Sequence, residues 1–421
     1  MFFIDYELPW YSRYFLFLDA PFRFCFRHLF FYFQAKSIQK YTGVVILSKA
    51  QKRAHMSIAL LESIPILGHV VALFDWLLFH KPLRLIHIDT TKTLIDECSA
   101  ELHFMIDSVL PFYKAVITNQ GKDPLAEAKK LEKYIPERFI EEMKALSAVS
   151  EIPYESILLL NTVISMLELA SSSIYAVSKD RTTGLEAREF ATNYFPSLGR
   201  SHHAVDVDNS FKRYDDMSSY KPKLSTRDLL RTLRRVHYKA TIHTVIADTN
   251  ARKLSVAVGC DFSANRPLKV FKAASLFGTN EEVLGTHKTM LARNLDWPMA
   301  YFAPLTRLFV RKGSAQFHTT AMIHAPGFLG GYTGMNEHGL TLASSIVPSK
   351  SQEGIPNQLL YRKILEEAKT IHEAYKIINL SQPSSAMNVI IAGPDGIMHA
   401  ELDPMRRKVG AISVSFSSFQ S

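Results

Sequence analysis

The spacing of apolar residues predicts a helical region followed by a strand-rich region. Over residues 90–171 apolar positions recur every three or four residues, which is the period of one helix face. The clearest face carries Leu94, Leu102, Ile106 and Leu110. Further helices are expected over Pro124–Tyr134, over Glu137–Val149 and after Ile152-Pro153, because proline is tolerated in a first helical turn.

From about Ser172 the apolar period changes to two, which is typical of strands with one buried face. Three hairpins are expected, in which His243–Ala247 pairs with Leu254–Val258, Leu308–Arg311 with Gln316–Met322, and Asn388–Ala392 with Met398–Leu402. Short helices are expected over Thr226–Val236, Leu359–Ala368 and His372–Leu380. The strands do not alternate with helices as in a parallel sheet, so the pattern predicts an α+β fold with segregated elements.

The N-terminal region raises the question of a membrane. Residues Met1–Gln34 are rich in aromatic side chains but contain charges such as Asp19 and Arg23, which exclude a signal-peptide core. The stretch Ile64–Phe79 is apolar, but it is short for a span and contains Asp75. A buried helix, a helix lying on a membrane and a spanning helix all stay open. We expect a cytoplasmic or membrane-associated protein, since nothing indicates export.

Composition excludes several classes of protein. Of 421 residues, 47% are apolar and 21% charged, which is ordinary for folded domains. The three cysteines are too few for a disulfide scaffold and lack the spacing of a zinc site, and Cys25 and Cys98 lie in apolar contexts typical of a core. The net charge of +9 has no long basic run, so we expect no nucleic-acid partner, whereas contact with an anionic membrane surface is compatible with it.

Four stretches carry polar groups that could perform chemistry. They are Arg293-Asn294-Leu295-Asp296-Trp297, the glycine-rich Gly330–Leu340, Ala191-Thr192-Asn193-Tyr194-Phe195, and Ala170-Ser171-Ser172-Ser173-Ile174. Each alone has a structural interpretation. Arg-x-x-Asp is usually an ion pair, and glycine and asparagine in the second and third stretches are typical of turns.

Together these stretches resemble the choloylglycine hydrolase superfamily of N-terminal-nucleophile amidases, which includes acid ceramidase and the isopenicillin N acyltransferases. RNLDW, GMNEHGL, the PDGIMHAEL hairpin, TNYF with the later SFKRY, and the helical lead-in from Glu137 are similar to that group's markers. The resemblance covers roughly residues 137–410. It implies an αββα four-layer sandwich preceded by a helical prosegment. With the apolar N-terminal region at 1–89, for which membrane association stays open, we expect a helical prosegment at 90–170 and a catalytic domain at 171–421.

The resemblance also implies a chemistry. Members of this group cut their own precursor, and the α-amine of the new N-terminal residue serves as general base for its side chain. That side chain then attacks a linear amide, and water or another acceptor takes the acyl group. By their positions in the motifs, Asp296 would hold the α-amine, Arg293 would orient the nucleophile, Asn193 would hold the oxyanion, and Arg213 matches a later arginine. No cofactor is implied.

The identity of the nucleophile stays open. The family's cysteine follows the apolar lead-in helix, and here that place holds Ser171. Serine can act in this way because the α-amine base serves either atom. Cys260 is a rival, since Gly259-Cys260 resembles a cleavage junction, and a chain with no working nucleophile is the third alternative.

The order of the family's segments is also unusual. Arg293 lies 122 residues beyond Ser171, whereas fewer than about twenty separate the corresponding residues in the family. The segment between them resembles the part that normally ends the family's chain. The two halves of the domain therefore look exchanged, and the connections of the sheet are expected to be permuted.

The predicted function is hydrolysis or acyl transfer of a linear, non-peptide amide with an apolar acyl group, from a small-molecule or lipid substrate. Tyr301, Phe302 and Phe328 are candidates for an acyl pocket, or else ordinary core aromatics. An inactive, membrane-associated relative is the alternative, and a thioesterase or phospholipase is a third. His202-His203, His318 and His324 lack ligand spacing with carboxylates, so no metal site is expected.

Overall fold

A computed structural model describes residues 83–167, 171–198, 209–236, 241–259, 263–279, 284–297, 302–347, 353–404 and 408–416. These belong to one compact unit, Phe79–Ser421. Several predictions fall outside the described residues, namely those on Met1–Gln34, Ile64–Phe79, Cys25, His202-His203, Cys260 and Tyr301. None of the helices in the described part is both long and apolar enough to cross a membrane.

The predicted run of helices is confirmed. It comprises α5 (Thr91–Phe104), a π-helical segment (Met105–Val109), α6 (Leu110–Asn119), α7 (Pro124–Glu132), α8 (Glu137–Ser150) and α9 (Tyr154–Leu167). Local sequence explains where helices begin. The Thr90 hydroxyl accepts from the Thr93 amide, and the Asp123 carboxylate accepts from the Leu125 amide ahead of Pro124. Leu94, Leu102 and Leu110 are buried, as their shared face predicts.

The strand-rich region forms two sheets. The eight-stranded sheet runs β1 (Leu85–Ile88), β8 (Arg307–Arg311), β9 (Thr320–His324), β10 (Thr333–Asn336), β11 (Thr341–Ile346), β12 (Met387–Gly393), β13 (Gly396–Asp403) and β14 (Lys408–Phe416). The six-stranded sheet runs β3 (Glu186–Ala191), β2 (Ser171–Asp180), β7 (His287–Asp296), β4 (Thr241–Asp248), β5 (Lys253–Val258) and β6 (Lys269–Phe271). Antiparallel pairing dominates both sheets, which fits the α+β expectation.

The predicted hairpins form, with one difference in length. β4 pairs with β5 and β12 with β13 in antiparallel register. β8 and β9 also pair, but β9 begins at Thr320, so Gln316–Thr319 belongs to the connecting loop. β1 pairs with β8 in parallel, which the sequence pattern did not predict.

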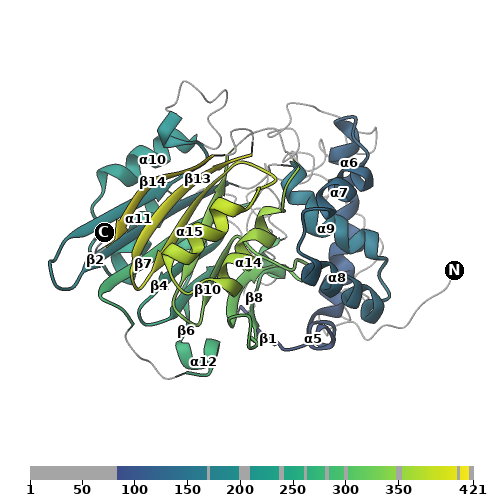
Figure 1. Cartoon of the computed structure of the whole chain (residues 1–421), viewed down its shortest axis with the longest axis horizontal. Helices are drawn as coiled ribbons and strands as arrows, with labels where there is room; N and C mark the ends of the chain where they lie inside the picture. The colour runs from purple at the N-terminus through teal and green to yellow at the C-terminus, as the bar shows by residue number, and fades with distance from the viewer. Residues whose placement is uncertain are drawn as a thin grey trace, which may run out of the picture. The chain divides into compact units, whose positions relative to one another are not determined.

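Helices cover the outer faces of the two sheets (Figure 1). Helices α14 (Asn357–Glu367) and α15 (Ile371–Leu380) pack against the eight-stranded sheet, and α10 (Ser210–Ser219) and α11 (Thr226–Arg235) pack against the six-stranded sheet. Three shorter helical segments lie at Pro196–Leu198, Ser263–Asn265 and Phe302–Leu305, and the short helix α12 consists of Ala273–Phe277. Between the sheets lies an apolar core that includes Ile174, Val245 and Leu291 from one sheet and Leu308, Ala321 and Ile390 from the other.

The unusual order of segments is accommodated within the six-stranded sheet. β7 lies between β2 and β4, although a long segment separates β2 from β7 in the chain. That segment supplies β3 on one side of the pair and β4, β5 and β6 on the other. Strand pairing depends on spatial neighbours rather than on chain order, so β2 and β7 still form a ten-residue antiparallel ladder.

Candidate active site

Three strand ends meet where the sequence predicts the nucleophile. Ser171, the first residue of β2, is paired in backbone register with Asp296, the last residue of β7. Thr241, the first residue of β4, is paired with Asp296 from the other side. The register thus brings the chain position of Ser171 beside Asp296, although Asp296 lies 125 positions further along the chain.

A buried cation joins the polar groups at these strand ends. Arg213 of α10 donates through Nη1 to the Ser173 hydroxyl at 2.8 Å and to Asp296 Oδ2 at 3.2 Å. Its Nη2 donates to Asn193 Oδ1 at 2.9 Å. The Thr241 hydroxyl donates to Asp296 Oδ1 at 2.5 Å. All five side chains are buried, so charge and hydrogen bonding act in a medium of low polarity.

The loop that carries Asn193 is held by the opposite sheet. Asn388 of β12 donates through Nδ2 to the carbonyls of Thr192 at 3.0 Å and Tyr194 at 2.7 Å. Asn193 itself donates through Nδ2 to the carbonyl of Ile346 at the end of β11. The Thr192 hydroxyl donates to the carbonyl of Ser210, where α10 begins. The Thr-Asn pair therefore fixes both the amide of Asn193 and the start of the helix that carries Arg213.

Arg293 points to the other face of β7. Residues three apart in a strand lie on opposite faces, so Arg293 and Asp296 diverge, and Asp296 forms an ion pair with Arg213. The Arg293 guanidinium lies between the sheets and donates to the Tyr332 carbonyl at 2.7 Å and to the Thr333 hydroxyl. Burial lowers the pKa of Arg293 to about 9, which still leaves it a cation at neutral pH.

A small cavity of about 40 Å³ lies on the Arg293 side of β7. It is lined mostly by apolar and aromatic residues, among them Leu295, Trp297, Phe302, Phe328 and Tyr332. The sequence offered Phe302 and Phe328 as residues of an acyl pocket or as core aromatics. In the structure both side chains are buried, and both line this cavity.

Two histidines also line this cavity. Burial holds the pKa of His243 well below its usual value and lowers that of His324 to about 3, so both rings are neutral at pH 7. His324 Nδ1 contacts the carbonyl oxygen of Ala325 at 2.9 Å and its ring stacks on Phe309. His324 is therefore a buried histidine of the core.

Of the residues expected to carry chemistry, the structure brings Asn193, Arg213 and Asp296 into contact and pairs the backbone of Ser171 with Asp296. Arg293 lies apart from them on the cavity side, and Cys260 is outside the described residues. Sequence reasoning missed Ser173, Thr241 and Asn388. A signal was available for Ser173, because the alternation of side chains in a strand puts Ser173 on the same face as Tyr175.

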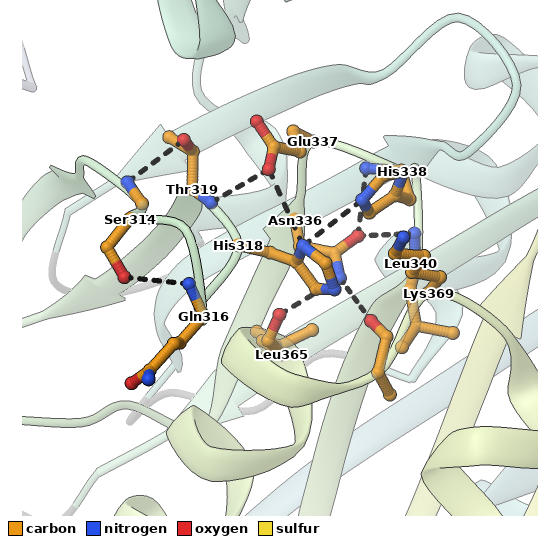
Figure 2. Close-up of polar contacts among 12 residues, drawn as sticks. Ser314, Gln316, His318, Thr319, Asn336, Glu337, His338, Leu340, Leu365 and Lys369 are labelled. Atoms are coloured by element: carbon orange, nitrogen blue, oxygen red, sulfur yellow. Dashed lines mark hydrogen bonds and ion pairs between the residues drawn. The ribbon is translucent and has the colours of Figure 1, made fainter.

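The GMNEHGL turn, residues 334–340, has a structural role, and a cluster of polar side chains lies beside it. Asn336 Oδ1 accepts from the amides of His338 and Leu340, and its Nδ2 donates to the carbonyls of Leu365 and Ala368 (Figure 2). Beside this turn, His318 Nδ1 lies 3.2 Å from His338 Nε2 and 3.6 Å from Glu337 Oε1. His318 therefore has a carboxylate neighbour in space that the spacing along the sequence did not indicate. Residues 19 apart in the chain meet because β9 and β10 are adjacent.

The α+β fold with two packed sheets is compatible with the class of N-terminal-nucleophile proteins. Residues 283–415 match the family model described as acyl-coenzyme A:6-aminopenicillanic acid acyl-transferase, which belongs to the N-terminal-nucleophile hydrolase-like superfamily. The match spans 133 of the 421 residues and confirms the resemblance seen in the sequence; the matched family suggests an acyltransferase or amidase. No curated protein matches the chain.

Proposed function

We propose that the chain is a self-processing amidase or acyltransferase in which cleavage between Ala170 and Ser171 makes Ser171 the N-terminal nucleophile. The observation that carries the proposal is the meeting of three strand ends. Ser171 begins β2 in register with Asp296, whose carboxylate is held by Arg213 and Thr241. In this proposal the domain has the αββα arrangement of its class, with a helical segment before the cleavage point.

The cleavage uses the hydroxyl of Ser171. Its oxygen attacks the carbonyl carbon of Ala170, an ester forms, and the peptide nitrogen leaves as the α-amine of Ser171. Water then hydrolyses the ester and frees the hydroxyl. An α-amine with a pKa of about 8 exists partly as the neutral base near pH 7 and can take the hydroxyl proton in later turnovers. Asp296 is the counter-ion proposed for that amine in its protonated form.

The same hydroxyl then transfers an acyl group from a linear amide. It attacks the amide carbon, the amine leaves with a proton, and water or another acceptor removes the acyl group from Ser171. We assign stabilisation of the oxyanion to Asn193, whose position is fixed by Ile346 and by Arg213. Arg293 stays charged beside the cavity and contributes positive potential there.

The substrate proposed is an amide with an apolar acyl group. The support is the lining of the cavity, which includes Leu295 of β7 and the aromatic side chains of Trp297, Phe302 and Phe328. At about 40 Å³ the cavity holds the beginning of an acyl chain rather than a long chain, so binding requires side chains to move. The apolar N-terminal sequence favours an amide derived from a membrane lipid.

Intact mass and N-terminal sequencing test the proposal. We expect the purified full chain to yield a fragment that begins at Ser171, and we expect the Ser171→Ala variant to stay whole. Cys260→Ala is the matched variant for the rival nucleophile and is expected to cleave as the wild type does. A new terminus at Cys260 moves the nucleophile to that residue. A folded wild-type chain that stays whole overturns the proposal and leaves a non-catalytic relative.

A further inference from the structure

Three groups that ligate metals converge beside the turn after β10. His318, Glu337 and His338 each offer one ligand atom, and these atoms lie within 4.8 Å of one another. His318 comes from the loop before β9, and Glu337 and His338 follow β10 directly. Figure 2 shows the two imidazoles and the carboxylate close together, where the loop before β9 meets the turn after β10. Nothing in the proposed reaction uses them.

The spacing of the two ring nitrogens fits a tetrahedral ion. Zinc binds histidine nitrogen at about 2.0–2.1 Å, so two nitrogens on a tetrahedral ion lie roughly 3.3 Å apart. His318 Nδ1 and His338 Nε2 are 3.2 Å apart, and the third donor, Glu337 Oε1, is 3.6 Å from His318 Nδ1. The ring centres of His318 and His338 lie 4.4 Å apart and the ring planes meet at 85°.

The turn holds these donors in place before any ion arrives. Asn336 fixes the backbone that follows Glu337 by accepting hydrogen bonds from the amides of His338 and Leu340. Glu337 Oε1 accepts from the Thr319 amide at 3.2 Å, which ties the turn to the loop of His318. A site on a rigid turn loses little conformational entropy when it binds a ligand.

The charge of one donor also suits a cation. The Glu337 carboxylate would balance part of the charge of a divalent ion, whereas neutral imidazoles would not. All three donor side chains are only partly buried, so water can supply a fourth ligand.

We propose that His318, Glu337 and His338 form a site for a divalent ion of the zinc class, with water in the remaining position. Two imidazoles and one carboxylate select zinc, cobalt or nickel over magnesium and calcium, which prefer oxygen ligands. The ion would join the β8–β9 loop to the β10–β11 turn. Thr333, whose hydroxyl accepts a hydrogen bond from Arg293, is the first residue of β10. The proposed ion site follows the last residue of β10, so it lies at the other end of that strand from the contact with Arg293.

Titration of the metal-free full chain with zinc alone tests the proposal. We expect calorimetry to give one site per chain and cobalt in place of zinc to give the absorption of a tetrahedral ion. We also expect zinc to raise the midpoint of thermal unfolding, because an ion that binds only the folded state stabilises it. His338→Gln and His318→Gln are expected to weaken binding by more than about tenfold, since even loss of an outer-shell partner costs that much.

Two further variants separate the site from other causes. His87→Gln removes an exposed histidine of β1 and is expected to bind zinc as the wild type does. Glu337→Gln keeps the size of the side chain and an oxygen for the Thr319 amide, so it reports on the lost ligand even if the histidine variants unfold. The proposal is wrong if Glu337→Gln and both histidine variants bind zinc with wild-type affinity, which would place the ion among the chain's other histidines.

Discussion

Arg213 holds the candidate site together at the scale of single residues. Its guanidinium reaches Ser173, Asp296 and Asn193 at once, from a helix that packs on the outer face of the six-stranded sheet. The guanidinium meets these three acceptors with donors that are fixed in one plane, on two different nitrogens. A lysine at this position keeps the charge and loses the geometry.

We therefore expect Arg213→Lys to slow cleavage at Ser171 by more than about tenfold, which corresponds to about 1.4 kcal/mol in the barrier. The rate is followed by the appearance of the new terminus after refolding. The control is Arg231→Lys, since Arg231 pairs with Asp228 on the exposed face of α11 and should leave the rate unchanged. Equal rates for Arg213→Lys and wild type would remove Arg213 from the site.

The cavity gives a second prediction at this scale, which rests on the proposed amidase activity. Phe328 lines the cavity, and its ring centre lies 6.4 Å from that of Phe302. Phe328→Leu enlarges the space, so we expect the ratio of kcat/KM for long over short acyl amides to rise about tenfold. Phe112→Leu, on α6 and outside the cavity lining, should leave that ratio unchanged. An unchanged ratio in Phe328→Leu would mean that acyl chains bind elsewhere.

At the scale of elements, buried charges join the helical region to the eight-stranded sheet. Glu142 of α8 lies 2.6 Å from Arg311 of β8 and 2.6 Å from Arg362 of α14. Burial alone would raise the pKa of Glu142, but the two arginines outweigh burial and hold that pKa below its usual value. Glu142 is therefore ionised at neutral pH and balances two cations that have little access to water.

We expect Glu142→Gln to lower the free energy of unfolding at pH 7 by about 3 kcal/mol, because two largely buried cations lose their shared partner. A carboxyl with a lowered pKa stabilises the fold above its unfolded pKa of about 4.3 and loses that effect as pH falls. The difference between variant and wild type should thus shrink below about pH 4 in denaturant titrations. Glu141→Gln, on the exposed side of α8, is the control. A difference that does not change with pH would contradict this account.

Elements with local signals could be predicted from the sequence, and those made by distant contacts could not. The helices around Leu94 and Leu102 follow from periodicity, and the start of α11 follows from Ser225, which caps the Asp228 amide. β1 has only four residues and pairs in parallel with a strand far along the chain, so no local pattern reports it. The meeting of His318 with His338 likewise depends on which strands become neighbours. Asn193, Arg213 and Asp296 were found through motifs, whereas Thr241 has no motif and joins them only by register.

At the scale of the whole described unit, the residues before Ser171 are part of the same fold as those after it. β1 extends the eight-stranded sheet by pairing with β8. Asn161 of α9 donates to the Gly327 carbonyl at 2.9 Å and accepts from the Leu329 amide at 2.8 Å. Trp297, which follows Asp296, donates to the hydroxyl of Tyr113 on α6 at 3.1 Å. One apolar core runs through both parts.

This continuity predicts the fate of the fragments after the proposed cleavage. We expect the fragment that ends at Ala170 to stay bound to the fragment that begins at Ser171, because separation would expose a shared core and break the β1–β8 pairing. Gel filtration of cleaved protein should give one peak containing both fragments in native buffer, at high salt as well as low salt. Denaturant should separate them, and the uncleaved Ser171→Ala variant supplies the reference elution volume. If the first fragment is lost in native buffer, the helical region is a removable prosegment instead of a permanent part of the folded unit.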